Sequence, residues 1–404
     1  MCKFLKIILF LFILPGWSPA QTYAIRADRL INGRDNEAIA HPVIIVKDNR
    51  IIEVNFNNHI PDSAKLIDLT GYTVLPGLID VHTHLLADGG DYDKDLYQNS
   101  PAFRSLRAAK YLKISLHNGF TTIRDVCTEG AGFADVDLSR AVDAGYIEGP
   151  AVIPSGKGIA VTGNYLPSLR QQNWEITLPA GTQYVSGKDE CLKAVREQIA
   201  RGCQWIKVFA DWQFVTFTGE ELKTIVDEAR KQGVAVAAHA GYPEGIELSI
   251  KSGVRSIEHG FFINDQLIQM AIDSNVFWSP TVSVIVEDHD TMILNKLYPS
   301  LNKAYKKGLK IVLGTDIGSY SWEVNEAKEL EYYVKYAGLK PMDAIKTGTS
   351  NAAEMLNKKS SIGQIAPGFL ANIIAVKGNP LDDISMLQHV KFVMKEGRIY
   401  VLPK

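Results

Sequence analysis

The segment LIDVHTH at residues 78–84 opens a series of apolar, strand-length runs and ends in two closely spaced histidines. Side chains alternate between the two faces of a β-strand, so His82 and His84 point the same way while Thr83 points away. Two imidazoles on one face can bind a single metal ion. The simpler alternative is an ordinary strand with two hydrogen-bonded histidines. Further candidate ligands on later strand-like segments favour the metal site.

Length and composition fit a large folded enzyme. With 404 residues, 46% of them hydrophobic and 22% charged, the chain can bury the core of a large barrel with an appendage. The formal net charge of -2 shows no basic surplus. We therefore expect no nucleic-acid partner and no membrane-surface helix, and small molecules as partners. A homo-oligomer is left open, because the chain does not reveal its oligomeric state.

Residues 1–20 are typical of an export signal. Two lysines, Lys3 and Lys6, precede the apolar run 7–14, and the small-residue exit Ser-Pro-Ala follows at 18–20. The run is too short to span a bilayer, so we expect a secreted or periplasmic protein without stable membrane insertion after signal cleavage. An uncleaved signal anchor is the alternative. Three cysteines remain in the mature chain, which allows at most one disulfide, and none is needed for the interpretation.

Both ends of the mature chain carry short β-like runs separated by turn residues. Together, residues 21–71 and 363–404 predict one small β-sandwich domain. The runs are 23–27, 43–46 and 50–54 near the start, and 371–376, 390–394 and 396–400 near the end.

Between them, residues 72–362 alternate strand-like and helical segments. This alternation predicts an α/β fold, a (β/α)8 TIM barrel, whose chemistry lies at the carboxyl ends of its strands. The helix after Thr218 begins with a capping box and is stopped by Gly233. An open doubly wound sheet is the alternative, but no glycine-rich phosphate loop follows an early strand. The eight predicted strands lie near 78–84, 121–126, 151–155, 205–209, 234–239, 254–259, 276–280 and 310–316.

Three more polar residues end predicted barrel strands. His239 ends the run 234–239, His259 ends 256–259 and Asp316 ends 311–316. Singly, each has a plain explanation, since a histidine can be a hydrogen-bonded wall residue and an aspartate can cap the next helix. All of these explanations would have to hold at once, and a shared metal site accounts for the set more simply.

Lys207 lies inside the apolar run WIKVF at 205–209. A lysine that points into a barrel core is costly unless it is paired or chemically changed. Its neutral amine can take up carbon dioxide, and the two oxygens of the resulting carbamate can bridge two cations. Pairing with an inward acid such as Asp125 is the structural alternative.

These motifs carry a resemblance along almost all of the mature chain. The chain resembles the metal-dependent amidohydrolase superfamily, in the branch of imidazolonepropionase-like and Xaa-Pro or Xaa-Arg dipeptidase-like hydrolases. The matching stretches are VLPGLIDVHTH (74–84), GFTTIRD (119–125), WIKVF (205–209), AAHA (237–240), SIEHG (256–260), LGTD (313–316) and GQIAPGFLAN (363–372).

The resemblance implies a binuclear metal centre. N6-carboxylated Lys207 would bridge two divalent metal ions, with zinc expected first and manganese, cobalt or iron as alternatives. A metal-bridged hydroxide would attack an amide carbonyl, with Asp316 as the group that transfers the proton. The implied ligands are His82, His84 and Asp316 for one ion, and His239 and His259 for the other.

The resemblance says less about the substrate. It implies hydrolysis of a C–N amide bond in a dipeptide or an N-acyl amino acid. Two departures count against dipeptides: TGNY stands at 162–165 where such relatives carry Thr-Gly-Gly-His, and HAGY at 239–242 where they carry His-Ala-His-Gly. We expect Tyr165, Arg170 and Tyr242 to contact the substrate, with Arg170 pairing with a carboxylate. Trp174, Trp212 and Trp322 lie in neighbouring predicted loops, and all six could equally be surface residues.

Two other functions stay open. One is a cyclic-amide hydrolase of the imidazolonepropionase type. The other is a metal-bearing protein that binds such a ligand without turnover. The ligand set with Asp316 argues against pure binding, because binding alone needs no group that moves a proton.

Overall fold

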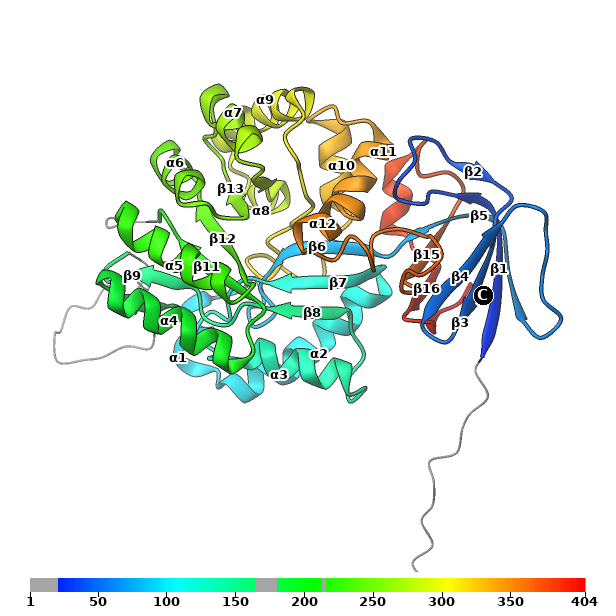
Figure 1. The fold of residues 1–404 in the computed structure, drawn as a ribbon, viewed down its shortest axis with the longest axis horizontal. Coiled ribbons are helices and arrows are strands. Elements are labelled where there is room, and N and C mark those ends of the chain that lie inside the picture. Colours follow the sequence, from blue (N-terminus) through cyan, green and yellow to red (C-terminus); the bar gives the residue numbers. More distant parts are fainter. Residues whose placement is uncertain (1–20, 165–179, 213–215, 404) are drawn as a thin grey trace, which may run out of the picture.

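The computed structural model describes residues 21–164, 180–212 and 216–403. A large part has helices around a set of strands, and a small β part contains the first and last strands of the chain (Figure 1). The predicted signal, residues 1–20, lies outside the described residues.

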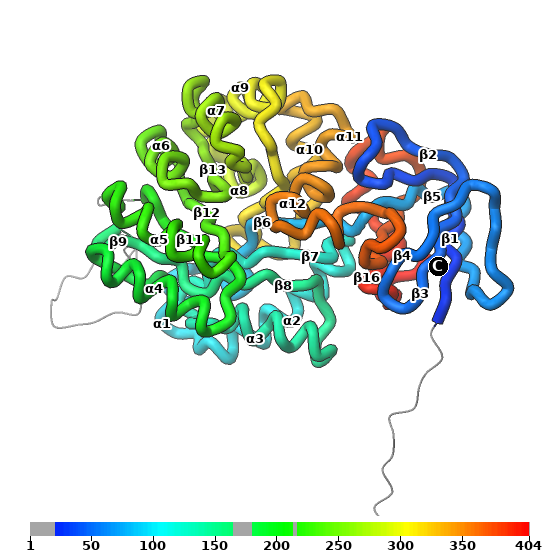
Figure 2. Tube along the Cα trace, in the orientation of Figure 1, coloured from blue at the N-terminus to red at the C-terminus, as the bar shows by residue number. Residues whose placement is uncertain are grey.

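The small part is built from both chain ends. The blue amino-terminal and red carboxy-terminal segments lie side by side (Figure 2). One sheet joins them in the order β17-β16-β15-β5-β1-β3-β4, and β2 pairs with β1. Strand β5 pairs parallel with β1 between residues 65 and 74, and its residues 72–76 pair antiparallel with β15. The strands are β1 (Thr22–Leu30), β2 (Ile39–Ala40), β3 (Val43–Lys47), β4 (Arg50–Asn55), β5 (Lys65–Pro76), β15 (Ile373–Lys377), β16 (Phe392–Lys395) and β17 (Arg398–Val401).

This sheet bends around its own apolar core. At its edge, Ile51 of β4 donates to the carbonyl of Phe369 at 2.9 Å and accepts from the amide of Gly368 at 2.8 Å. Side chains of β1, β3 and β4 share one buried cluster with those of β15 and β16. The two layers of the predicted β-sandwich are therefore parts of one continuous sheet.

The large part is a (β/α)8 barrel, as predicted. Its strands run parallel in two ladders, β6-β7-β8 and β10-β9-β11-β12-β13-β14. Seven of the eight predicted barrel strands are present. They are β6 (Leu78–Thr83), β7 (Phe120–Asp125), β8 (Ala151–Pro154), β11 (Trp205–Phe209), β12 (Ala235–Ala240), β13 (Ser256–His259) and β14 (Phe277–Ser279).

The eighth predicted strand, near residues 310–316, is irregular in the structure. It lies between β14 and β6 and is joined to each of them by backbone hydrogen bonds. The amide of Val312 donates to Trp278 on one side at 2.9 Å, and Leu313 accepts from Val81 on the other at 3.0 Å. The prediction of a regular strand was wrong, although the segment occupies the expected place.

Close packing explains the irregularity. A Cβ atom on Gly314 would lie 2.1 Å from Oγ of Ser279 and 2.7 Å from Cβ of His82, so the backbone passes closer than a side chain would allow. Asp316 then takes a left-handed φ of 63°. A residue in this left-handed conformation does not continue a regular ladder.

Two short strands between β8 and β11 were not predicted. They are β9 (Ile159–Val161) and β10 (Gln183–Val185), which pair parallel with each other. Three residues are too few to show an alternating pattern, so only the folded chain reveals them.

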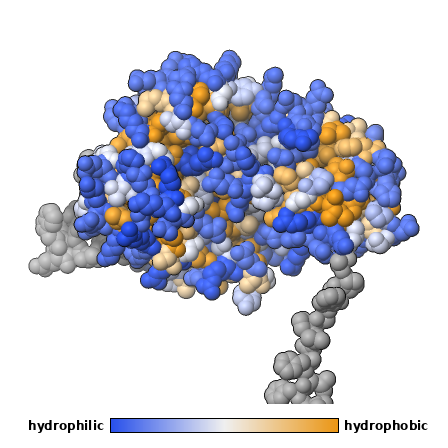
Figure 3. Space-filling model, viewed as in Figure 1, coloured by the Kyte–Doolittle hydropathy of each residue, from blue (hydrophilic) through white to orange (hydrophobic). Residues whose placement is uncertain are grey.

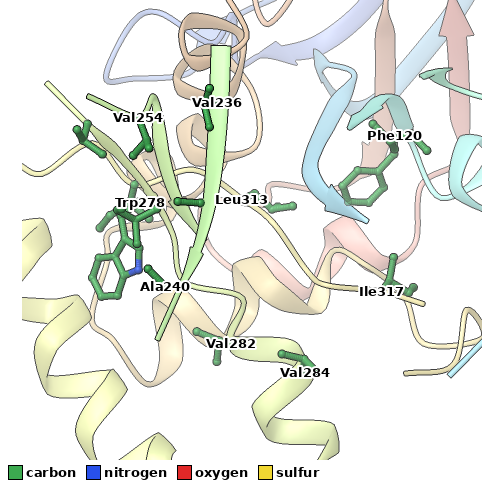
Figure 4. Close-up of a cluster of buried hydrophobic side chains, with 14 of the residues drawn as sticks. Phe120, Val236, Ala240, Val254, Trp278, Val282, Val284, Leu313 and Ile317 are labelled. Carbon is green, nitrogen blue, oxygen red and sulfur yellow. The ribbon is translucent and has the colours of Figure 1, made fainter. Parts of the chain in front are cut away.

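Helices cover the outside of the barrel. Helix α5 begins with the predicted capping box between Thr218 and Glu221. Val236 and Ala240 of β12 share a buried cluster with Trp278 of β14 (Figure 4). No helix of the described residues is long and apolar enough to cross a membrane. The helices are α1 (Tyr92–Gln98), α2 (Pro101–His117), α3 (Ala134–Asp143), α4 (Gly187–Arg201), α5 (Gly219–Lys231), α6 (Pro243–Ser252), α7 (Asp265–Asp273), α8 (Val282–Glu287), α9 (Thr291–Lys307), α10 (Lys328–Lys335), α11 (Pro341–Thr347), α12 (Ser350–Met355) and the 3₁₀ helix η1 (Ile384–Gln388).

The surface differs between the two parts. On the face shown in Figure 3, hydrophilic residues dominate the barrel, whereas a continuous apolar area lies over the small domain.

Candidate metal centre

Six polar side chains gather near the carboxyl ends of the barrel strands. Parallel strands in a barrel bring these ends to one face, which is where chemistry occurs in this fold. All six are buried, with exposures of 7% or less. They are His82 of β6, His84 just after it, Lys207 of β11, His239 of β12, His259 of β13 and Asp316 after the irregular segment.

Three of them form a compact group. Oδ1 of Asp316 lies 3.6 Å from Nε2 of His82 and 3.2 Å from Nε2 of His84. One potential ligand atom from each residue lies within 4.8 Å of the others. This spacing suits one ion held by two imidazoles and a carboxylate.

The other two histidines continue this group. The ring centroids of His239 and His259 are 4.3 Å apart, and those of His82 and His259 are 4.8 Å apart. Oδ2 of Asp316 lies 3.8 Å from Nδ1 of His259. Asp316 therefore lies close to His82, His84 and His259.

Lys207 interacts through its charge with residues of the same cluster. Burial lowers its pKa, and the acids that oppose this shift most are Glu258 and Asp316. The predicted alternative partner, Asp125, instead accepts from the amide of Leu85 at 2.6 Å. Lys207 thus lies among the imidazoles rather than in a separate ion pair with Asp125.

Beneath His82 lies a buried ionic network that the sequence analysis missed. Nδ1 of His82 lies 2.8 Å from Oε2 of Glu258, whose other oxygen accepts from Arg124 at 2.7 Å. Arg124 also donates to the carbonyl of Val81 and lies over the ring of Trp205. Arg124 and Glu258 are charged residues inside apolar strands, which is the signal that singled out Lys207.

On the other side, polar groups surround His84. Its Nδ1 lies 3.2 Å from the carbonyl of Cys127 and 3.5 Å from Oε1 of Glu129. Burial lowers the pKa of His84, but Asp316 and Glu129 outweigh it and raise the pKa to about 9. For the carboxyl group of Asp316, burial raises the pKa, but the neighbouring His82 and His84 have the larger effect and lower it to about 2.

Backbone strain is concentrated at the same place. His259, Thr281 and Asp316 have φ values of 72°, 47° and 63°, in the left-handed region that non-glycine residues rarely occupy. All three are buried. Strained conformations that the surrounding structure maintains are typical of functional sites.

The donor set fits divalent metal ions. Nε2 of His82 is buried and has no hydrogen-bond partner among the residues that the structure describes. Burial and the nearby Lys207 lower the pKa of His82 to about 4, and burial lowers the pKa of His239 and His259 well below its ordinary value. A neutral imidazole is the form that binds a metal.

The predicted substrate contacts are only partly described. Tyr165 and Arg170 lie outside the described residues. Tyr242 follows β12 and is 53% exposed, and its backbone amide donates to Asp211 at 3.0 Å. Asp211, another residue that the sequence analysis missed, thereby holds the loop beside His239.

Two tryptophans near the rim differ. Trp212 is 44% exposed, and its ring lies 4.7 Å from that of His239. Trp322 is buried, stacks on Tyr111 and donates to the carbonyl of Ala87. Trp322 lies in a loop, as predicted, but it is neither a surface residue nor open to a ligand, because its ring is buried against Tyr111 of α2.

Comparison with known proteins identifies the class. Residues 73–400 match the amidohydrolase family, and the chain belongs to that family. It is 29% identical to ochratoxinase of Aspergillus niger, over 97% of this chain and 89% of that protein. It is 25% identical to imidazolonepropionase of Pyrobaculum arsenaticum, over 87% of this chain and 91% of that protein.

The fold agrees with this assignment. A crystal structure of a Xaa-Pro dipeptidase with bound methionine in the active site matches with a TM-score of 0.87 and 30% identity, over 94% of this chain and all of that one. The protein is therefore a hydrolase that acts on carbon–nitrogen bonds. Its superfamily is generally metal-dependent, and His82, His84 and Asp316 form a suitable ligand group.

Proposed function

We propose that the protein is an exported enzyme that hydrolyses a C–N amide bond in a dipeptide or an N-acyl amino acid. Two divalent cations, zinc first, would be held by His82, His84, His239, His259 and Asp316, with carboxylated Lys207 between them. The observation that carries the proposal is the buried cluster in which Asp316 lies within 3.8 Å of three histidines. The bound methionine of the matched dipeptidase supports a ligand of amino-acid size.

Each protein group has a definite role in this proposal. Bound divalent cations would polarise the amide carbonyl and bring the pKa of a water toward neutrality. The low pKa of Asp316 keeps its carboxylate ionised at neutral pH, so Asp316 can accept a proton from the attacking water and return it to the leaving nitrogen. Glu258 holds Nδ1 of His82 and leaves Nε2 directed at Asp316.

Lys207 is suited to carboxylation. Burial lowers its pKa and so favours the neutral amine, which is the form that reacts with carbon dioxide. Addition of carbon dioxide to the neutral amine would release one proton and leave an anion beside His82, His239 and His259. Mass spectrometry under native conditions tests this step, with an expected gain of one carbon dioxide that is lost in acid.

A cyclic-amide hydrolase of the imidazolonepropionase type is the second candidate. Relatives at 25% identity favour it. Arguing against it, this chain carries Lys207, to which the resemblance gives the role of a bridge between two metal ions.

The deciding experiment combines metal analysis with a substrate screen. The purified full chain, loaded with zinc, manganese or cobalt, is assayed against dipeptides, N-acyl amino acids and cyclic amides. We expect two metal ions per chain and hydrolysis of an open-chain amide. Hydrolysis by the chelated protein at the same rate would contradict the metal requirement, and exclusive cyclic-amide hydrolysis would favour the second candidate.

The variant Asp316→Asn tests the proposed role of Asp316 in proton transfer. Loss of the proton-transferring group should lower kcat by about 10²–10⁴-fold, while circular dichroism and thermal unfolding stay close to wild type. Wild-type turnover in this variant would refute the role of Asp316. Export is tested separately by the amino-terminal sequence of the secreted protein, which we expect to begin at Gln21.

A further inference from the structure

The turn between β14 and α8 is strained at a position next to the cluster. Thr281 has φ 47° and ψ 53°, a left-handed conformation. A β-branched side chain disfavours this conformation more than most, so surrounding contacts must maintain it. Thr281 is fully buried.

Thr281 is the N-cap residue of α8 but does not cap it. A threonine at this position ordinarily accepts a hydrogen bond from the first turn of the helix. Here no side-chain cap bond is present, and Oγ1 of Thr281 lies 2.9 Å from Nδ1 of His259. The hydroxyl is directed at the cluster rather than at its own helix.

A distant carboxylate caps the helix in its place. Glu329 of α10 accepts from the amide of Val282 at 2.8 Å, from the amide of Ser283 at 2.7 Å and from Oγ of Ser283 at 2.6 Å. These amides would otherwise lack partners at the buried start of the helix. The Glu329 carboxylate therefore caps α8, and the Thr281 hydroxyl does not need to do so.

The position of Glu329 is costly unless these bonds are made. Its side chain is completely buried, and burial raises its pKa to about 7. Val282 and Val284 of α8 lie in the apolar cluster of Figure 4. Apolar packing and the carboxylate together determine where the turn lies.

We propose that Glu329 is a positioning residue for the metal centre. By bonding the first amides of α8, it maintains Thr281 in its strained conformation. The Thr281 hydroxyl then engages Nδ1 of His259 and leaves Nε2 as the nitrogen available to a cation. This inference rests on the proposed metal-dependent function and adds a residue that no expected ligand set contains.

Cobalt binding to the full chain tests the inference without any substrate. The variants are Glu329→Gln, Thr281→Val and Thr281→Ser, and Glu326→Gln is the matched control. Glu326 is also a buried glutamate of this region, but it bonds Asn118 and not α8. The readouts are cobalt affinity by chelator competition, the visible absorption of bound cobalt, and thermal unfolding.

We expect Glu329→Gln and Thr281→Val to lower the cobalt affinity of one of the two sites by about 10–100-fold and to change the visible absorption of the bound cobalt. Loss of groups that orient metal ligands has effects of this size. In Glu329→Gln, the side-chain NH₂ group replaces one carboxylate oxygen, so it cannot accept a hydrogen bond from one of the two backbone amides. In Thr281→Val, the side chain keeps the shape of threonine but loses the hydroxyl. Thr281→Ser and Glu326→Gln should bind cobalt like the wild type.

Two outcomes overturn the inference. One is a folded Glu329→Gln protein with wild-type cobalt affinity and absorption. The other, which decides the matter if Glu329→Gln does not fold, is equal cobalt binding by Thr281→Val and Thr281→Ser. If the wild-type chain binds no cobalt, the proposed metal centre itself fails, and the positioning role falls with it.

Discussion

Two buried lysines, one in each part of the molecule, have opposite surroundings. Lys395 of the small domain donates to the carbonyl of Gly149 in the barrel at 3.0 Å, which satisfies its charge with a backbone acceptor at the domain contact. The charge of Lys207 acts on His82, His239 and His259, and the acids that act most on Lys207 are Glu258 and Asp316. Burial lowers the pKa of both lysines. The surroundings of Lys395 join the two domains. The surroundings of Lys207 bring several buried ionisable groups together, which is typical of a functional site.

The backbone shows the same contrast. In the small domain, the left-handed non-glycine residues His41 and Asp48 lie in exposed turns, where such conformations are common. At the barrel mouth, His259, Thr281 and Asp316 take left-handed conformations while buried. In the exposed turns, the left-handed residues reverse the direction of the chain. In the buried site, they orient side chains toward the same cluster.

Replacing each lysine by methionine should give the largest difference. Lys207→Met removes the proposed bridge, so we expect kcat to fall by about two orders of magnitude or more and the metal content to drop from two ions to one. The free energy of unfolding should stay the same or rise, because an apolar side chain replaces a buried amine.

Lys395→Met is the matched variant in the small domain. It leaves the Gly149 carbonyl without its donor, so the free energy of unfolding should fall by about 1–2 kcal/mol, with metal content and kcat unchanged. Chemical denaturation, elemental analysis and steady-state kinetics measure these quantities. The contrast breaks down if both variants lose metal, or if neither does.

Metal binding should depend on pH through His84. In the metal-free protein its pKa is raised to about 9, so His84 is protonated at neutral pH and must release that proton to bind a cation. The apparent metal association constant should therefore rise by about tenfold per pH unit between roughly pH 6 and pH 8. Calorimetry in buffers of different ionisation enthalpy measures the released proton, and a pH-independent affinity would contradict this protonation state.

The smallest effect is expected at the surface of the small domain. Arg26 and Thr70 lower the pKa of Asp68 to about 2, but the Arg26 and Asp68 side chains are 35% and 46% exposed. Solvent screens such a pair, so Asp68→Asn should change the free energy of unfolding by less than about 1 kcal/mol. Denaturation at pH 7 checks this, and a larger loss would mean that exposed pairs also matter for this fold.

Much of the architecture could be predicted because it is local in the chain. The alternation of apolar runs and amphipathic helices indicated a barrel, and seven of its strands lie where the pattern placed them. Strand ends likewise predicted where His82, His239 and Asp316 would lie, because parallel strands carry their carboxyl ends to one face. The eighth segment departed from regularity, and it ends in the left-handed Asp316.

What the sequence determined by itself is therefore the set of polar groups and the face that they share, since both follow from periodicity along the backbone. Only the tertiary structure decided how these groups are held. Arg124 reaches Glu258 across 134 residues, and Glu329 bonds Ser283 across 46. Such contacts depend on how distant elements pack, and no spacing in the chain encodes them.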